Sequence, residues 1–360
     1  MKTSVTSPSV AERLRGAVWG SLAGDAACLG SHWVYDLNEL ARLFPDGIAG
    51  FEPSRQGHYH FGKQPGDQTH YGDGALLMLE SIARCGAFSA GDFGERFMAV
   101  MGSDTYTGYR DNATRNTLKN FHEFIANNPG TRFDFQQGAD DDQPATVTRL
   151  APLVARHWRD TRLPDLAASA AKVCQNNARA VAYAQGLAEM LRRLIEGSEP
   201  EAALTAVAAA MATAGAPESE VAEKIRAALA AQKESVLEAT LRFGQSCQLA
   251  GSFPAALQAV LANRHDYAAA ILATASAGGD NAGRAAMIGA CLGAYLGVGA
   301  IPESWRSRLT AHDLIERELV LIVEVADAPR ILEQRLARFD PARHGGEVMA
   351  TDEPLGAEKW

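Results

Sequence analysis

Two segments of this chain carry glycine at every fourth position, which limits how they can pack. One lies near the N-terminus and the other within the uncharged run Ala285–Ile301, and the glycines are Gly16, Gly20, Gly24, Gly289, Gly293 and Gly297. Residues four apart share one face of an α-helix, and a helical glycine costs roughly 1 kcal/mol relative to alanine. Such a face indicates that another backbone lies very near. Either the two helices pack on each other, and an antiparallel arrangement then brings Asp25 toward Asp280, or the glycines accommodate bulky, unrelated neighbours.

The uncharged run itself is interpreted as a buried core helix. Its 17 residues fall short of the ~20 apolar residues that a membrane-spanning helix needs, and nothing in its composition requires lipid. We expect no membrane partner. We also expect the first turn of this helix, which follows Gly279 and Asp280, to face a cleft.

The composition favours helices over strands. Hydrophobic residues make up 47% of the 360 residues and aromatic residues only 7%, whereas strands prefer β-branched and aromatic side chains. No linker divides the chain. We therefore predict an all-α fold in a single compact multi-helix domain at residues 9–339, with a disordered N-terminus (1–8) and a mobile C-terminal tail (340–360). The main loops are expected at Phe44–Thr69 and Asn127–Pro144.

Charge and cysteine content exclude several classes of protein. The net charge of −9 leaves no basic surface for nucleic acid or anionic lipid. The first ten residues are polar, unlike a secretory signal. The cysteines are odd in number and widely spaced, as expected for reduced and mostly buried thiols in a cytoplasmic protein. They are Cys28, Cys85, Cys174, Cys247 and Cys291.

Carboxylates stand one residue after glycine in three separate segments. Asp73 and Asp280 both stand just before an apolar helix, where the helix dipole favours a negative charge by ~0.3–1 kcal/mol. The alternative interpretation is that these aspartates are ordinary helix caps.

Together these segments resemble the ADP-ribosylglycohydrolase family, in order and over most of the chain. The matching stretches are GAVWGSLAGDA, HYGDGALLMLESIA, TRLAPL and GGDNAGRAAMIGACLGAYLGVGAIPESW. The resemblance implies a compact all-α fold. It also implies two Mg²⁺ ions in a cleft and hydrolysis of an N- or O-glycosidic bond to ADP-ribose.

The metal motifs of that family are degenerate in this sequence. Of each motif only the first aspartate, Asp73 or Asp280, survives, and His32 stands where the family often has a glutamate. Mg²⁺ prefers an octahedral set of oxygen ligands with one or two carboxylates. We therefore expect no Mg²⁺ or at most one weakly held ion, on Asp73 and Asp280. The motifs resemble a variant branch that includes jellyfish crystallins and their selenoprotein relatives.

The candidate site residues follow from these motifs. Carboxylates in a dry cleft have a raised pKa and can activate water. We predict catalytic roles for Asp73, Asp280 and His32. Predicted substrate-binding residues are Tyr71, Asn281, Arg284, Asp36 and Gly279.

Two of these residues have structural alternatives. Arg284 stands four residues after Asp280 and can form a buried ion pair with it, and His32 can be an ordinary core histidine. A separate hypothesis is a Zn²⁺ site, although the spacing fits no tight motif and surface histidines are the alternative. Its candidate ligands are His58, His60, Asp67, His70 and Asp73.

The sequence thus predicts a hydrolase of a glycosidic bond in ADP-ribose or a related nucleoside compound. Its partner would be a small-molecule substrate or an ADP-ribosylated molecule, and the oligomeric state is left open. One alternative is a non-catalytic binder of ADP-ribose-like ligands or a crystallin-like structural protein. Another is a hydrolase of some other small glycosidic or amide substrate.

Overall fold

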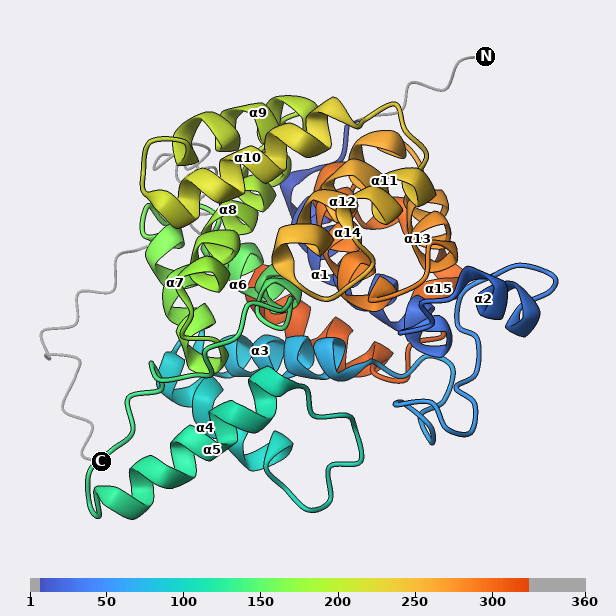
Figure 1. Cartoon of the computed structure of the whole chain (residues 1–360). Helices are drawn as coiled ribbons and strands as arrows, with labels where there is room; N and C mark the ends of the chain where they lie inside the picture. The colour runs from blue at the N-terminus through green and yellow to red at the C-terminus, as the bar shows by residue number, and fades with distance from the viewer. Residues whose placement is uncertain (1–6, 324–360) are drawn as a thin grey trace, which may run out of the picture.

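A computed structural model describes residues 7–323 of the chain, and in this range the fold is all-α (Figure 1). The only β-type pairings there are two isolated bridges, Val34 with Gly279 and Ala139 with Gln175. The expected disordered N-terminus and mobile tail lie outside the described residues, apart from Ser7 and Pro8. The predicted fold class is confirmed.

The helices are connected mostly by short turns. Their bounds are α1 Val10–Cys28, α2 Leu37–Leu43, α3 His70–Cys85, α4 Ala90–Met101, α5 Asn112–Asn127, α6 Leu150–His157, α7 Leu163–Cys174, α8 Ala178–Ile195, α9 Pro200–Met211, α10 Ala216–Ala230, α11 Val236–Phe243, α12 Leu249–Ala262, α13 Tyr267–Ser276, α14 Asn281–Leu296 and α15 Glu303–Arg306. The 3-10 turns are η1 Leu29–Ser31, η2 Val147–Arg149 and η3 Val298–Ala300. The expected loops at Phe44–Thr69 and Asn127–Pro144 contain no helix.

Helices α1 and α14 pack against each other through the two glycine faces. Gly20 lies against Gly289, and a Cβ added to Gly20 would lie 2.8 Å from the Gly289 carbonyl carbon. Gly16 lies against Gly293 in the same way. Because the partner number falls as the α1 number rises, the helices run antiparallel. The prediction that the glycine helices pack on each other is confirmed.

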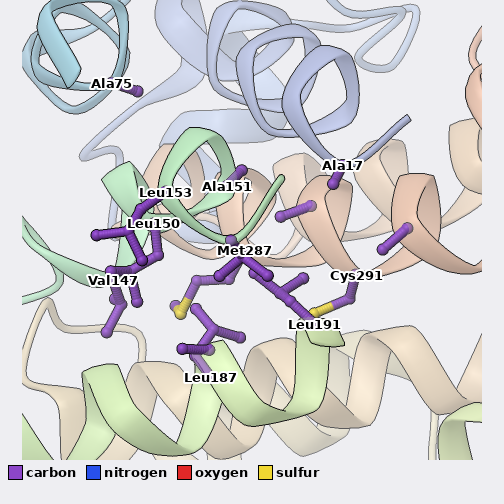
Figure 2. Packing of buried hydrophobic residues seen from close by; sticks show 14 of the residues in the cluster. Ala17, Ala75, Val147, Leu150, Ala151, Leu153, Leu187, Leu191, Met287 and Cys291 are labelled. Carbon is purple, nitrogen blue, oxygen red and sulfur yellow. The ribbon is translucent and has the colours of Figure 1, made fainter. Parts of the chain in front are cut away.

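The other helices cover this central pair (Figure 1). Helices α12 and α13 contact α14, α3 and α6 contact α1, and α8 contacts both. Figure 2 shows Leu187 and Leu191 of α8 meeting Met287 and Cys291 of α14 in the core. All these side chains are at most 1% exposed.

All five cysteines are free thiols, three of them buried, as predicted. Among the described residues, no helix is long and apolar enough to cross a membrane.

Candidate functional site

A two-glycine turn positions Asp280 next to the segment that follows α1. Gly278 and Gly279 have φ values of 69° and 65°, in the left-handed region that favours glycine. The Gly279 N–H donates to the Val34 carbonyl, and the Gly279 carbonyl accepts from the Trp33 N–H, both at 2.8 Å. Gly279, a predicted substrate-binding residue, thus uses both of its backbone polar groups to hold the turn.

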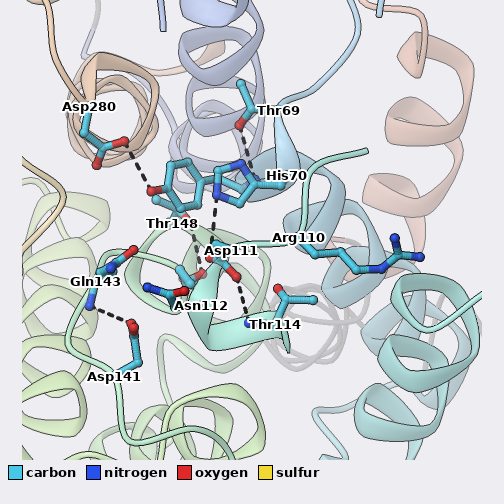
Figure 3. Close-up of polar contacts among 12 residues, drawn as sticks. Thr69, His70, Arg110, Asp111, Asn112, Thr114, Asp141, Gln143, Thr148 and Asp280 are labelled. Carbon is cyan, nitrogen blue, oxygen red and sulfur yellow. Dashed lines mark hydrogen bonds and ion pairs between the residues drawn. The ribbon is translucent and has the colours of Figure 1, made fainter. Parts of the chain in front are cut away.

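The Asp280 carboxylate is fully buried beside two of the other predicted residues. Its Oδ1 accepts a hydrogen bond from the Tyr71 hydroxyl at 3.2 Å (Figure 3) and lies 3.5 Å from His32 Nε2. Burial raises the pKa of Asp280 to about 6, while the Arg284 charge and the Tyr71 hydroxyl act to lower it. Asp280 occupies the N-cap position of α14, but its side chain caps no N–H there. The helix-cap alternative is therefore wrong for its side chain.

His32 and Asn281 contact each other next to the Asp280 carboxylate. His32 Nδ1 lies 3.3 Å from Asn281 Oδ1. The Asn281 amide donates to the carbonyls of Ser31 and Ala275, which fixes its orientation. Both His32 and Asn281 are fully buried. The structure thus brings His32, Asn281 and Tyr71 together around Asp280.

Arg284 is also fully buried, but its hydrogen bonds go to the backbone. Its guanidinium donates to the carbonyl of Gly278 and to that of Gln245 at 3.2 Å. It therefore braces the two-glycine turn and acts on Asp280 through its charge, instead of forming the direct ion pair that the sequence left open.

Asp73 points away from Asp280. Tyr71 and Asp73 are two positions apart on α3, so their side chains project roughly 200° apart around the helix. The Asp73 carboxylate accepts hydrogen bonds from the Lys63 ammonium and the Tyr106 hydroxyl, both at 2.7 Å. Burial raises the pKa of Asp73, and Lys63 acts to lower it.

Asp36 lies apart from this buried group. Its carboxylate is exposed and caps α2 by accepting from the N–H groups of Asn38 at 2.7 Å and Glu39 at 3.3 Å. This is the capping role that the sequence left open for such aspartates.

A cavity of about 310 Å³ has Trp33 in its wall. Four of its nine lining residues are aromatic, and the lining residues are Trp33, Tyr35, Tyr59, Tyr109, Asp111, Asn112, Arg115, Gln143 and Cys247. Asp111 caps α5 through Oδ1, which accepts from Thr114 N–H at 2.7 Å. Its Oδ2 lies 3.6 Å from His70 Nε2 (Figure 3). The cavity therefore has a carboxylate in its wall.

Three residues of this region carry no signal of their role in the sequence. Asp111 and Arg115 lie in an unremarkable polar stretch before and within α5, and Lys63 lies in a loop. An aspartate before a helix signals a cap, but no local pattern tells which caps also face a cavity. The surface interpretation of the histidines is wrong for His60 and His70, which are at most 2% exposed.

The comparison with known proteins identifies the class to which this fold and site belong. A model of the ADP-ribosylglycohydrolase family matches residues 6–338, and the chain belongs to this family. The resemblance seen in the motifs is confirmed.

Two relatives and one solved structure are similar to this chain over most of its length. Crystallin J1A of Tripedalia cystophora is 26% identical over 311 residues, which cover 84% of this chain and 94% of the crystallin. Crystallin J1B of the same organism is 25% identical over 320 residues, covering 87% and 97%. A solved structure titled ADP-ribosylglycohydrolase-related protein complex shares the fold with a TM-score of 0.70 at 23% identity, covering 88% of this chain and 99% of that chain.

The buried carboxyls make stability depend on pH. Burial raises the pKa of Asp25 from 3.8 to about 7, so between these values the folded state binds more protons than the unfolded state. The free energy of unfolding is then expected to fall as the pH rises through this window, and Asp280 adds a change of the same sign. Asp25→Asn should flatten the dependence, as measured by urea unfolding across the window. Asp313→Asn, at a fully exposed side chain, should leave the slope unchanged, and an equally steep slope in Asp25→Asn would contradict the assignment.

Proposed function

We propose that this chain binds ADP-ribose or a related nucleoside compound in the aromatic cavity and hydrolyses its N- or O-glycosidic bond without the two-Mg²⁺ centre of the usual family members. The observation that carries the proposal is the cavity of about 310 Å³ beside Trp33, with the carboxylate of Asp111 in its wall. Ligand pockets of roughly 300–1,000 Å³ with aromatic walls and a few placed polar groups are typical of small-molecule sites.

The cavity wall offers matching surfaces to the parts of such a ligand. Trp33, Tyr59 and Tyr109 pack edge-to-face on one another, and their rings can stack a nucleobase. The Arg115 guanidinium lies 5.8 Å over the Tyr109 ring centre. An arginine at this place suits a phosphate, because its planar donors match phosphate oxygens.

Asp111 can act on the glycosidic bond. Cleavage of such a bond passes through an oxocarbenium-like state, which a nearby carboxylate stabilises. Asp111 Oδ1 is engaged in capping α5, whereas Oδ2 has no hydrogen-bond partner. The negative charge of the Asp111 carboxylate can stabilise the developing positive charge from the cavity wall.

The residues around Asp73 support a metal-free proposal. The Lys63 ammonium at 2.7 Å already supplies the positive charge beside that carboxylate. Asp280 faces a histidine and a tyrosine, whereas Mg²⁺ prefers oxygen ligands and several waters. This donor set does not fit a two-Mg²⁺ centre, and no step of the proposed reaction uses one.

The test measures the release of free ADP-ribose from an ADP-ribosylated substrate. The reaction is run in the presence of a chelator, and the released product is detected by chromatography. Asp111→Asn is expected to lower kcat by about 100-fold or more, the range of a positioned acid–base or charge-stabilising group. Asparagine still caps a helix, so α5 should remain folded. Asp134→Asn is a matched control at an exposed loop position and should keep full activity.

The same assay decides the catalytic roles predicted for Asp73, Asp280 and His32. Unchanged turnover in Asp73→Asn or Asp280→Asn would remove that residue from the mechanism. Full activity of Asp111→Asn would overturn the role given to that carboxylate.

A second candidate function is non-catalytic binding or a crystallin-like structural role. It is favoured by the names of the two crystallin relatives. It is also favoured by the Lys63 ammonium, which lies 2.7 Å from the Asp73 carboxylate. A thermal shift with ADP-ribose but no turnover of any ADP-ribosylated substrate would support the binder. Turnover of another glycosidic or amide substrate alone would support a different hydrolase.

A further inference from the structure

Three histidines from separate parts of the chain meet in the interior, between Asp280 and Asp111. His32 follows η1, His60 lies in the loop before α3, and His70 is the first residue of α3. Each is at most 2% exposed. Each offers a ring nitrogen, and these nitrogens all lie within 4.8 Å of one another.

The ring nitrogens of this cluster lack hydrogen-bond partners. His32 Nε2 and both ring nitrogens of His60 and of His70 are buried and unpartnered. Buried polar groups are almost always paired, so a concentration of unpaired ones needs an explanation. His32 Nδ1 is the exception, since it lies 3.3 Å from both Asn281 Oδ1 and the Ala282 backbone nitrogen. A hydrogen bond to the second nitrogen of a metal-binding histidine is the usual way in which its ring is oriented.

A fourth histidine ties two of the three together. His58 Nε2 lies 2.7 Å from the His32 carbonyl, and its Nδ1 accepts from the His60 backbone N–H at 3.2 Å. The same ring can make both contacts only with its proton on Nε2. His58 thus fixes the separation between the His32 and His60 backbones.

The three rings are held in the neutral form that binds metal. Burial lowers the pKa of His60 to about 2 and the pKa values of His32 and His70 well below the ordinary value, and the neighbouring histidines and cations contribute. Neutral imidazole is a common ligand of Zn²⁺.

Two buried carboxylates flank the cluster and supply negative charge. Asp111 Oδ2 lies 3.6 Å from His70 Nε2, and Asp280 Oδ1 lies 3.5 Å from His32 Nε2. Neighbouring ligand atoms of a tetrahedral Zn²⁺ are about 3.4 Å apart, given bond lengths near 2.1 Å. Asp280 Oδ1 already accepts from Tyr71, whereas Asp111 Oδ2 has no hydrogen-bond partner. Neither carboxylate belongs to the group of atoms that lie within 4.8 Å of one another, so both supply negative charge beside the three histidines.

We propose that His32, His60 and His70 form a site for one Zn²⁺ or a similar borderline divalent metal, with three protein ligands and one open position and with the Asp111 carboxylate beside it. This site is distinct from the Mg²⁺ positions that the family resemblance implies. It requires only binding, so it stands whether or not the chain hydrolyses a glycosidic bond.

The test uses untagged full-length protein that has been treated with a chelator and then titrated with Zn²⁺ or Co²⁺. We expect one Zn²⁺ per chain, a higher unfolding temperature with Zn²⁺, and Co²⁺ absorption bands of a tetrahedral site without thiolate charge transfer. X-ray absorption of the Zn²⁺-loaded protein should show three imidazoles. A folded protein that binds neither ion, or a thiolate signature, would overturn the proposal.

Matched variants locate the ion. His60→Gln should weaken Zn²⁺ binding by roughly 100-fold or more, and His122→Gln, at an exposed position of α5, should bind as the unchanged chain does. Equal affinity of the two variants would refute the site. If His60→Gln does not fold, the count of imidazoles in the unchanged chain decides, and fewer than three would refute the ligand set.

Discussion

Replacing Gly20 with alanine is expected to lower the free energy of unfolding by about 3 kcal/mol, at the upper end of the usual cost of overpacking a core. The new methyl group would overlap the Gly289 carbonyl, which is backbone and cannot rotate away. Alanine gains roughly 1 kcal/mol in helix propensity over glycine, and this gain is too small to offset the overlap. Urea unfolding followed by circular dichroism measures the change.

Gly299→Ala is the matched control. A Cβ at Gly299 meets nothing within 4 Å, so its stability should change by less than about 0.5 kcal/mol. The double variant Gly20→Ala with Gly289→Ala should lose less than the sum of the single losses, because the first methyl group already separates the helices. A stabilised Gly20→Ala would contradict the close packing of α1 and α14.

Lys63→Met is expected to destabilise the chain by about 2 kcal/mol, because it leaves the Asp73 carboxylate buried without its cation. The loss of stability should be smaller than for a fully buried ion pair, because the Lys63 and Asp73 side chains are 15% and 19% exposed. The pKa of Asp73 should rise further in the variant, because Lys63 acts to lower it. Equilibrium unfolding at neutral pH measures the loss.

This variant also tests whether Lys63 replaces a metal ion. With the ammonium gone, millimolar Mg²⁺ should raise the unfolding temperature of Lys63→Met through binding to the folded state, and it should do so more than for the unchanged chain. Lys119→Met is the control, because Lys119 is mostly exposed and lies 3.7 Å from Glu123. An exposed pair of this kind contributes about 0–1 kcal/mol. Equal stability of Lys63→Met and Lys119→Met would show that the Lys63–Asp73 pair stabilises the fold no more than an exposed ion pair does.

The helical fold and its central pair could be predicted from the sequence. The glycine period indicated that another backbone lies near each face, and packing of the two faces on each other was one of the two interpretations left open; the contact of Gly20 with Gly289 decides for it. Helix ends were less certain. Proline is typical of the first turn of a helix, yet α12 begins at Leu249 and contains Pro254 in its interior.

The group of residues that meets around Asp280 was predicted in part. Motif resemblance led to Asp280, and the structure gathers His32, Tyr71 and Asn281 around it. The direction of a side chain within a helix and the partner that it finds are tertiary properties, so the pairing of Asp73 with Lys63 left no mark in the sequence. The same holds for the histidines, whose residues belong to three segments that only the fold brings together.

The contact between α1 and α14 has a consequence for how the chain is made. Tyr267 donates to the Gly20 carbonyl from 247 positions further along the chain. At a synthesis rate of about 5–20 residues per second, the first helix therefore waits on the order of tens of seconds for its partner to leave the ribosome. During that time its apolar, glycine-lined surface is uncovered, so a nascent chain halted before residue 281 should be a substrate for chaperones.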